Sequence, residues 1–319
     1  MSSIITKKEP SQRSVVIAFI ALYLIWGSTY LANLFAIKSI PPFIMGGSRF
    51  LAAGLLLFFW SIAKGDRIPS VGSIAKISLC GILMLSIGTG AVIWVEQFIP
   101  SGLTAIIVAT VPLWFVALDK REWHLYFSNK WIITGLLVGF IGVLLLFAGK
   151  GTANFKGDRM QLISFFVLTI GSISWAIGSL YSKYQATEGS TSMKAAIQMM
   201  SAGIVSFFFA LIAGEYSTFS IHTISFESIK AVIYLVLFGS LIGYMAYIWL
   251  LSVRPPSQVG TYAYVNPLVA VFLGWLLADE KISSQQIIAL CVVLAGVIMV
   301  NFSKENKQRT KQKQSVSSS

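Results

Sequence analysis

The sequence predicts an all-helical integral membrane protein with ten transmembrane helices arranged as two inverted five-helix repeats. Its 319 residues are 56% hydrophobic and only 11% charged, whereas soluble domains carry about 25% charged residues. The apolar residues come in blocks of roughly 20, the length that a helix needs to cross a bilayer. The two halves of the chain also match each other in order. This composition excludes both a water-soluble enzyme and a disordered chain.

The apolar blocks predict ten spans with short loops. They cover 14–36, 42–62, 74–98, 101–119, 130–148, 159–183, 193–214, 228–251, 258–278 and 284–302. The first block is too long for the core of a signal peptide, and no small-residue cleavage site follows it, so we expect a retained helix. The domain organisation that we expect is an N-terminal segment 1–13, a first repeat 14–148, a linker 149–158, a second repeat 159–302 and a disordered basic tail 303–319.

The basic residues predict the orientation. With the N-terminus inside, the inner segments hold 17 Lys and Arg side chains and the outer loops hold 6, with Arg49 alone inside a span. Such an excess marks the cytoplasmic side. We therefore expect a multi-pass membrane protein with both termini cytoplasmic.

The net charge of +12 does not indicate nucleic-acid binding, because the basic residues are scattered through the loops and form no stripe. Cys80 and Cys291 lie within apolar blocks, and His124 and His222 have no metal-ligand spacing around them. We expect no cofactor, no metal and no nucleic-acid partner. The expected partners are the bilayer and a small-molecule substrate.

Self-comparison reveals the duplication. With a shift of 149, Trp26 falls on Trp175 and Gly54 on Gly203; with a shift of 154 or 155, Trp94 falls on Trp249 and Pro112 on Pro267. A five-span unit is odd, so its second copy must enter the membrane from the opposite side. Inverted repeats of this kind are typical of secondary transporters, whose site lies near the midplane between the repeats.

Several motifs resemble the EamA family of ten-span permeases in the drug/metabolite transporter superfamily. They are Ile25-Trp26-Gly27-Ser28-Thr29-Tyr30, Pro41-Pro42 with Ser48-Arg49-Phe50, Val95-Glu96-Gln97, Pro100-Ser101-Gly102-Leu103, Ala109-Thr110-Val111-Pro112-Leu113-Trp114, Tyr262-Ala263-Tyr264-Val265-Asn266-Pro267-Leu268 and Asp279-Glu280-Lys281. The resemblance covers 14–302. It implies a transporter in the bacterial inner membrane that moves amino acids, other small metabolites or drugs, and it fixes no single substrate.

Pro112 and Pro267 fall at matching positions within two spans. A proline removes one helix hydrogen bond, and in lipid the freed carbonyl needs a partner or a wet cavity. Paired interruptions of this kind are a pointer to a transporter site. The alternative is a pair of structural kinks.

Arg49 and Glu96 are the ionisable residues embedded in spans. Such charges are costly in a bilayer and usually face the bundle interior. We expect Arg49 to face the cavity and to bind a substrate carboxylate or pair with Glu96; the alternative is an arginine that snorkels to the outer headgroups. Its counterpart in the second half is Gln198, so the site is not charge-symmetric.

Aromatic and polar side chains share helix faces at i, i+4 and i+7 spacing. The remaining candidate cavity residues are Trp26, Tyr30, Trp94, Trp175, Ser179, Tyr244, Tyr262 and Asn266, and Asn33 and Ser240 share their faces. Packing between helices is the alternative for the two mid-span tryptophans.

The sequence contains no His-acid pair, no paired intramembrane carboxylates and no phosphate-binding loop. We therefore expect a non-enzyme: a secondary transporter, exporting small metabolites by alternating access between the repeats. A membrane-embedded enzyme or a lipid-handling protein that uses the cavity between the repeats is the alternative.

Overall fold

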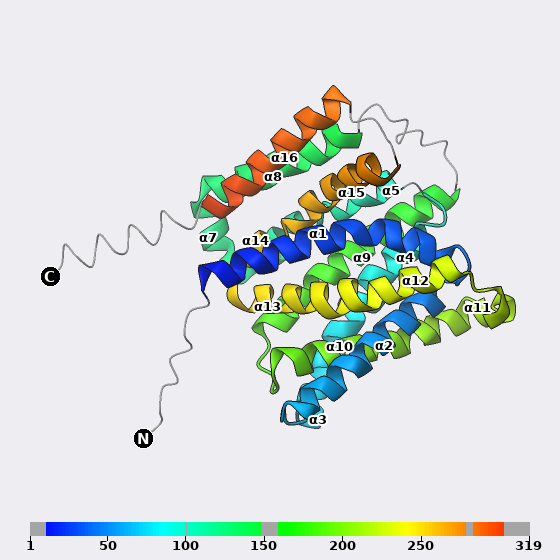
Figure 1. Cartoon of the computed structure of the whole chain (residues 1–319). Helices are drawn as coiled ribbons and strands as arrows, with labels where there is room; N and C mark the ends of the chain where they lie inside the picture. The colour runs from blue at the N-terminus through cyan, green and yellow to red at the C-terminus, as the bar shows by residue number, and fades with distance from the viewer. Residues whose placement is uncertain (1–10, 100, 148–158, 279–282, 303–319) are drawn as a thin grey trace, which may run out of the picture.

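The computed structural model describes residues 11–99, 101–147, 159–278 and 283–302 (Figure 1). The linker expected at 149–158 and the tail expected at 303–319 fall outside these ranges. The long helical segments are α1 (Gln12–Ile37), α2 (Pro42–Ala63), α3 (Val71–Gly81) continued by η1 (Ile82–Thr89) and α4 (Gly90–Val95), α5 (Ser101–Val108), α6 (Val111–Leu118), α8 (Lys130–Phe147), α9 (Arg159–Tyr184), α10 (Thr191–Ile212), α12 (Phe226–Tyr234) continued by η4 (Leu235–Tyr244) and α13 (Met245–Val253), α15 (Tyr262–Ala278) and α16 (Ser284–Phe302).

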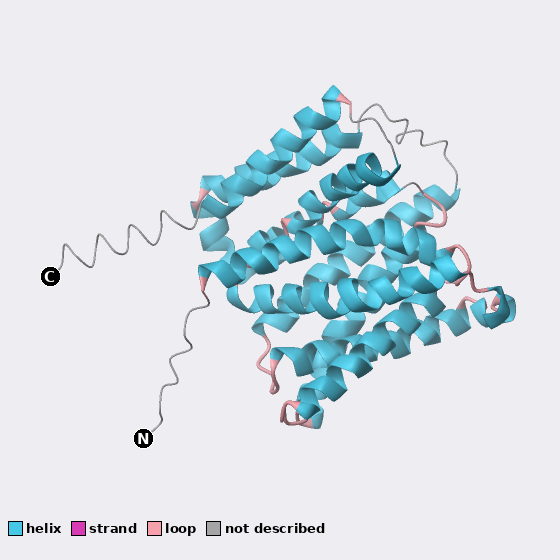
Figure 2. Ribbon diagram, in the orientation of Figure 1, coloured by secondary structure: helices cyan, strands magenta, loops and turns pink. Residues whose placement is uncertain are grey.

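Short helices join some of these segments. They are η2 (Lys120–Glu122), α7 (Trp123–Ser128), α11 (Glu215–Thr218), η3 (Ile221–Thr223) and α14 (Pro256–Val259). Across the described ranges the chain contains helices and loops and no strand (Figure 2), which confirms the expected all-helical class.

Seven of the described helices are long and apolar enough to cross a membrane, and the bent pair formed by 120–128 and 130–146 would make an eighth. The expected span 101–119 is not one continuous helix, because it breaks between α5 and α6 just before Pro112. The expected span 258–278 is divided as well, at Gly260 and Thr261 between α14 and α15. The ten-span arrangement therefore stays a prediction.

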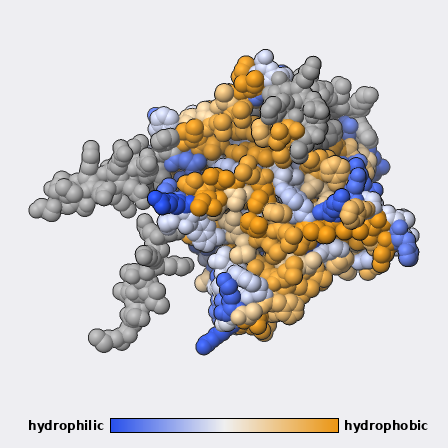
Figure 3. Space-filling model, viewed as in Figure 1, coloured by the Kyte–Doolittle hydropathy of each residue, from blue (hydrophilic) through white to orange (hydrophobic). Residues whose placement is uncertain are grey.

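The outer surface is apolar along the middle of the bundle. Large side chains such as Phe59, Phe166 and Leu211 are 65%, 63% and 63% exposed. In Figure 3 hydrophobic residues cover the middle of the visible face, and hydrophilic residues gather towards its two ends. A surface of this kind is stable only against lipid, because a water-soluble protein would not expose such a large apolar area.

Helices α2 and α10 pack closely through two glycines. A Cβ on Gly54 would lie 2.7 Å from the backbone nitrogen of Met200, and one on Gly203 would lie 2.7 Å from that of Leu51. These two contacts are reciprocal. With the shift of 149, Gly54 corresponds to Gly203 and Leu51 corresponds to Met200, so each glycine packs against the equivalent of the residue that faces the other. Small residues allow such close approach of helix backbones in membranes.

Helices α8 and α16 pack in the same reciprocal way. A Cβ on Gly142 would lie 2.6 Å from the side chain of Val293, and one on Gly296 would lie 2.4 Å from the backbone of Gly139. With the shift of 154, Gly142 corresponds to Gly296 and Gly139 corresponds to Val293, so these two contacts are reciprocal as well. The glycine contacts within each of these two helix pairs are therefore reciprocal.

The ends of α2 and α10 are fastened to each other. The Glu215 carboxylate, just beyond α10, accepts hydrogen bonds from the backbone N–H groups of Phe43 and Ile44 at the start of α2, at 3.1 and 2.9 Å. Conversely Asp66, just beyond α2, accepts from Ser190 and Ser192 at the start of α10. Carboxylates at helix N-termini satisfy free N–H groups and oppose the helix dipole. The two helices must therefore run antiparallel.

The first described helix starts at the same end of the bundle at which the last described helix ends. Figure 1 shows the start of α1 and the end of α16 together at one end.

Replacing Gly54 or Gly203 by leucine should lower the free energy of unfolding of the detergent-solubilised protein by about 2 kcal/mol or more, and its melting temperature with it. The added atoms would clash with the backbone of the neighbouring helix. Gly72→Leu is the matched control, since a Cβ at Gly72 meets nothing within 4 Å. Equal melting temperatures for all three variants would contradict the close packing of α2 and α10.

Asp66→Asn should destabilise the protein at neutral pH and have no effect in acid. Hydrogen bonds from Ser190 and Ser61 lower the pKa of the Asp66 carboxyl in the folded state. Its stabilising contribution is therefore present above the unfolded-state pKa and disappears as the pH falls through the folded-state value. Melting temperatures of parent and variant should differ at neutral pH and converge as the pH falls below the folded-state pKa of Asp66. A difference that stays constant with pH would contradict a stabilising role of the ionised Asp66 carboxylate.

Candidate functional site

Two π-helical segments lie at equivalent positions of the two halves. Segment η1 covers Ile82–Thr89 and η4 covers Leu235–Tyr244, and the shift of 154 superposes them. The π-helix is rare and occurs frequently at functional sites. Nothing in the hydrophobic pattern indicated it, because these blocks are apolar on all sides.

Each π-helix receives a tryptophan from the other half of the chain. A Cβ on Gly243 would lie 2.6 Å from Nε1 of Trp26, and one on Gly88 would lie 3.1 Å from the ring of Trp175. The two contacts are reciprocal, because Trp26 corresponds to Trp175 with the shift of 149 and Gly88 corresponds to Gly243 with the shift of 155. The tryptophan rings also meet each other edge to face, with centroids 5.6 Å apart.

Two tyrosines complete an aromatic cluster with these tryptophans. The Trp26 ring centroid lies 5.1 Å from that of Tyr247 and 4.9 Å from that of Tyr262, within the range of favourable aromatic pairs. The Tyr247 hydroxyl accepts a 3.0 Å hydrogen bond from Nε1 of Trp175 and lies 2.6 Å from Oγ of Ser179. The Trp26 indole donates to the Gly239 carbonyl at 3.0 Å.

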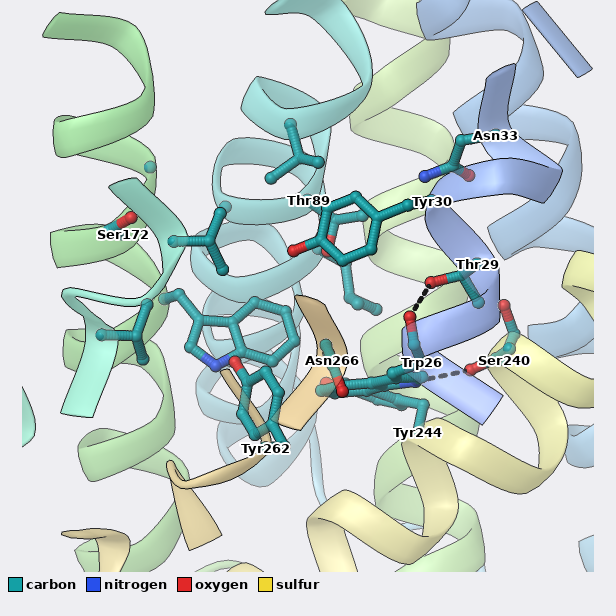
Figure 4. Close-up of a pocket in the computed structure, with 18 of the residues that line it drawn as sticks. Trp26, Thr29, Tyr30, Asn33, Thr89, Ser172, Ser240, Tyr244, Tyr262 and Asn266 are labelled. Atoms are coloured by element: carbon teal, nitrogen blue, oxygen red, sulfur yellow. Dashed lines mark hydrogen bonds between the residues drawn. The ribbon is translucent and has the colours of Figure 1, made fainter. Parts of the chain in front are cut away.

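A cavity of about 100 Å³ lies against this cluster, between the halves. The candidates that line it are Trp26, Tyr30, Arg49, Trp175, Tyr244, Tyr262 and Asn266. In Figure 4 Tyr30 and Thr89 lie on one side of the open space, and Trp26, Tyr262 and Asn266 lie on the other. Since one water needs roughly 10–15 Å³ by this measure, the space fits a solute of about seven to ten heavy atoms.

Arg49 faces the bundle interior. Its side chain is 5% exposed, and it donates from Nε to Ser240 Oγ at 3.0 Å and from Nη1 to Asn33 Oδ1 at 3.3 Å. Gly239 permits this placement, because a Cβ there would lie 2.8 Å from Nη2. The geometry favours the cavity-facing interpretation over snorkelling.

Asn266 brings an unused acceptor to the cavity wall. The residue is 2% exposed, and its Oδ1 has no hydrogen-bond partner within the described part of the chain. A buried polar atom without a partner costs about 1–3 kcal/mol. Because Asn266 lines the cavity, a ligand with a hydrogen-bond donor would satisfy this oxygen.

Gln198 repeats the contacts of Arg49 outside the cavity. Its Nε2 donates to Ser182 Oγ at 3.2 Å, and its Oε1 accepts from the Tyr244 hydroxyl at 2.9 Å. With the shift of 149, Arg49 and Asn33 become Gln198 and Ser182. The two halves therefore hold the same inter-helix hydrogen bond, charged in one and neutral in the other.

The structure does not bring all candidates to the cavity wall. Trp94, Glu96, Pro112, Ser179, Gln198 and Pro267 do not line it. Trp94 packs on Phe98 with centroids 4.8 Å apart. The prolines lie next to lining residues, Pro112 after Val111 and Pro267 after Asn266, so they shape the backbone beside the cavity.

Further lining residues include polar ones that we did not select from the sequence. Thr29, Thr89 and Ser172 line the cavity. Thr29 lies within the quoted first-span motif, but a threonine in an apolar helix often bonds its own backbone, as Thr29 does with the Trp26 carbonyl at 2.7 Å. Sequence alone offers no signal that separates these residues from structural ones.

Polar contacts join the two halves towards the end of the bundle where α1 starts. The Tyr23 hydroxyl lies 2.6 Å from Thr261 Oγ1. Nearby, the Asp119 carboxylate accepts from the hydroxyls of Tyr126 and Tyr184, each at 2.8 Å. The Tyr23–Thr261 and Tyr184–Asp119 hydrogen bonds therefore join the two halves at this end of the bundle.

This arrangement, a largely apolar cavity with a few polar side chains between two halves of an apolar helical bundle, is that of a membrane transporter. Residues 13–148 and 162–302 each match the EamA-like transporter family. The chain belongs to this family, which confirms the resemblance drawn from its motifs.

Curated relatives agree with this assignment. The chain is 38% identical over 288 residues to the uncharacterized inner membrane transporter YedA of Escherichia coli strain K12, covering 90% of each chain. It is 23% identical to the uncharacterized transporter YoaV of Bacillus subtilis, covering 90% of this chain and 97% of the relative. It is 21% identical to a probable amino-acid metabolite efflux pump of E. coli K12, covering 90% and 94%.

A solved structure shares the fold. A crystal structure superposes with a TM-score of 0.74 at 16% identity, covering 93% of this chain and 99% of the other. At this identity the likeness establishes the fold alone.

Asn266→Leu should leave the melting temperature unchanged or raise it, because the substitution removes an acceptor that has no partner. Gln198→Leu is the matched comparison. It should lower stability by about 1–3 kcal/mol, since it leaves the partners of two hydrogen bonds unsatisfied. Similar losses in both variants would contradict the proposal that Asn266 is held ready for a ligand.

Proposed function

We propose that this chain is a secondary transporter of small zwitterionic or amphipathic metabolites, amino acids among them, and that it works by alternating access between two inverted five-helix repeats. The observation that carries the proposal is the cavity between reciprocal helix pairs, with Arg49 on its wall. Transporter sites of this architecture lie between the repeats.

The reciprocal contacts support the inverted repeats. Trp26 on Gly243 and Trp175 on Gly88 exchange under the repeat shifts, as do the glycine contacts of α2 with α10. The family matches over 13–148 and 162–302 divide the chain near the same point. A two-fold axis in the membrane plane relates ten spans of this kind.

The chemistry of the cavity supports the substrate class. Arg49 offers planar N–H donors, which hold a carboxylate by charge-assisted hydrogen bonds. Asn266 offers an acceptor for an ammonium group, and the faces of Trp26 and Tyr262 attract cations. The volume of about 100 Å³ suits a solute of amino-acid size.

The charge bias supports the membrane orientation. The excess of Lys and Arg in alternate loops favours cytoplasmic termini, and the shared side of α1 and α16 in Figure 1 is compatible with that arrangement. The relatives named as an inner membrane transporter and a probable amino-acid metabolite efflux pump support location in the bacterial inner membrane and export.

Arg49→Leu and Arg49→Lys test the site. In liposomes loaded with radiolabelled L-amino acids, the parent should accelerate solute exchange. Arg49→Leu should reduce it at least tenfold while inserting as well as the parent, because it removes a cation from the membrane interior. Arg49→Lys should be impaired too, because an ammonium lacks the planar donor fork.

Exchange at the parental rate by Arg49→Leu would exclude Arg49 from the site. Lys230→Leu, which removes an exposed cation from the outer part of α12, is the control for the change of net charge and should exchange solute normally.

A further inference from the structure

Glu96 is a buried carboxyl group whose two oxygens accept no hydrogen bond from any residue that the structure describes. It follows the last turn of α4, and its side chain is 8% exposed. Thr89, Val92 and Glu96 follow one another at helical spacing on one face, and the first two line the cavity. Glu96 therefore lies about one turn beyond the cavity wall.

Two ionisable side chains interact with Glu96 electrostatically. They are Arg49 from α2 and Tyr30 from α1, and both line the cavity. Helix α4 also packs against η1 and α9. Segment η1 carries no ionisable residue, and the outer half of α9 carries only Arg159, which is exposed. Arg49 is thus the one cation near Glu96 among the described residues.

We propose that Glu96 is a proton-binding site linked to the anion site at Arg49. This inference rests on the proposed function. When a solute carboxylate binds Arg49, two anions share one buried cation, and Glu96 takes a proton from the solution that the cavity faces. When the solute leaves, Glu96 releases that proton to the side then open, and no covalent bond other than its O–H bond changes.

The linkage follows from the like charges. Two carboxylates that share a site cannot both stay ionised without cost, and the same effect separates the titrations of paired carboxylates in other proteins. Neither oxygen of Glu96 has a hydrogen bond that would hold it ionised. We expect a neutral Glu96 to strengthen carboxylate binding by about 10- to 100-fold.

The test uses the full chain in liposomes, with radiolabelled L-amino acids as probe and a pH-sensitive dye inside. From about pH 5.5 to about pH 8.5, the apparent KM of the parent should rise, by up to tenfold per pH unit for a single proton. In Glu96→Gln it should stay low and flat. Solute entry should acidify the lumen with the parent but not with Glu96→Gln.

Glu227→Gln is the matched control, because Glu227 is a solvent-exposed acid paired at 3.9 Å with Lys38; it should keep the pH profile of the parent. Glu96→Asp should keep a titrating group and therefore a sloping profile. If Glu96→Gln does not fold, Glu96→Asp carries the test, and its dependence of apparent KM on pH should be displaced from that of the parent. An Asp variant whose apparent KM does not change with pH overturns the proposal.

The outcomes separate the two proposals. Solute transport with the same pH profile and proton movement in Glu96→Gln and parent overturns the proton site and leaves the transporter intact. If the parent moves no amino acid, the proposed substrate class fails; infrared titration of the protein alone then decides the proton site. A buried carboxylic-acid band that titrates in the parent and is missing in Glu96→Gln supports it, and identical spectra overturn it.

Discussion

The packing of each first-helix tryptophan onto a glycine of the opposite π-helix holds the two halves together. Trp26 lies on Gly243 and Trp175 on Gly88, and the two rings meet each other edge to face. Neither half can form this packing alone, because the tryptophan that lies on each π-helix comes from the other half. Four aromatic rings fill one side of the interface, and the cavity beside them has a largely apolar wall that carries Asn33, Arg49 and Asn266.

On this symmetric frame the charges are asymmetric. Arg49 and Gln198 occupy equivalent positions with equivalent partners, Asn33 and Ser182. Only the arginine faces the cavity in the observed conformation. If the halves exchange conformations, the neutral cluster around Gln198 would face the opposite side. Binding of an anion would then be strong from one side of the membrane and weak from the other.

Much of this could be predicted from the sequence. Block lengths gave the helical class, and the drift of the repeat shift between 149 and 155 paired Trp26 with Trp175. The seven candidates on the cavity wall were found from intramembrane polarity and helix faces. The π-helices could not be found, because uniformly apolar segments carry no periodic signal. Ser179 and Gln198 do not line the cavity, although they share the polar and helical pattern of the residues that do, so a sequence pattern could not separate them.

The most direct test of the account is the accessibility of two equivalent positions from the two sides of the membrane. In a background in which Cys80 and Cys291 are alanine, single cysteines at Asn33 and at Ser182 are exposed to a membrane-impermeant maleimide in right-side-out and inverted vesicles. The account predicts that Asn33→Cys reacts from the periplasmic side only and Ser182→Cys from the cytoplasmic side only, and that a transported solute changes the two rates in opposite directions. Labelling of both cysteines from the same side would contradict it.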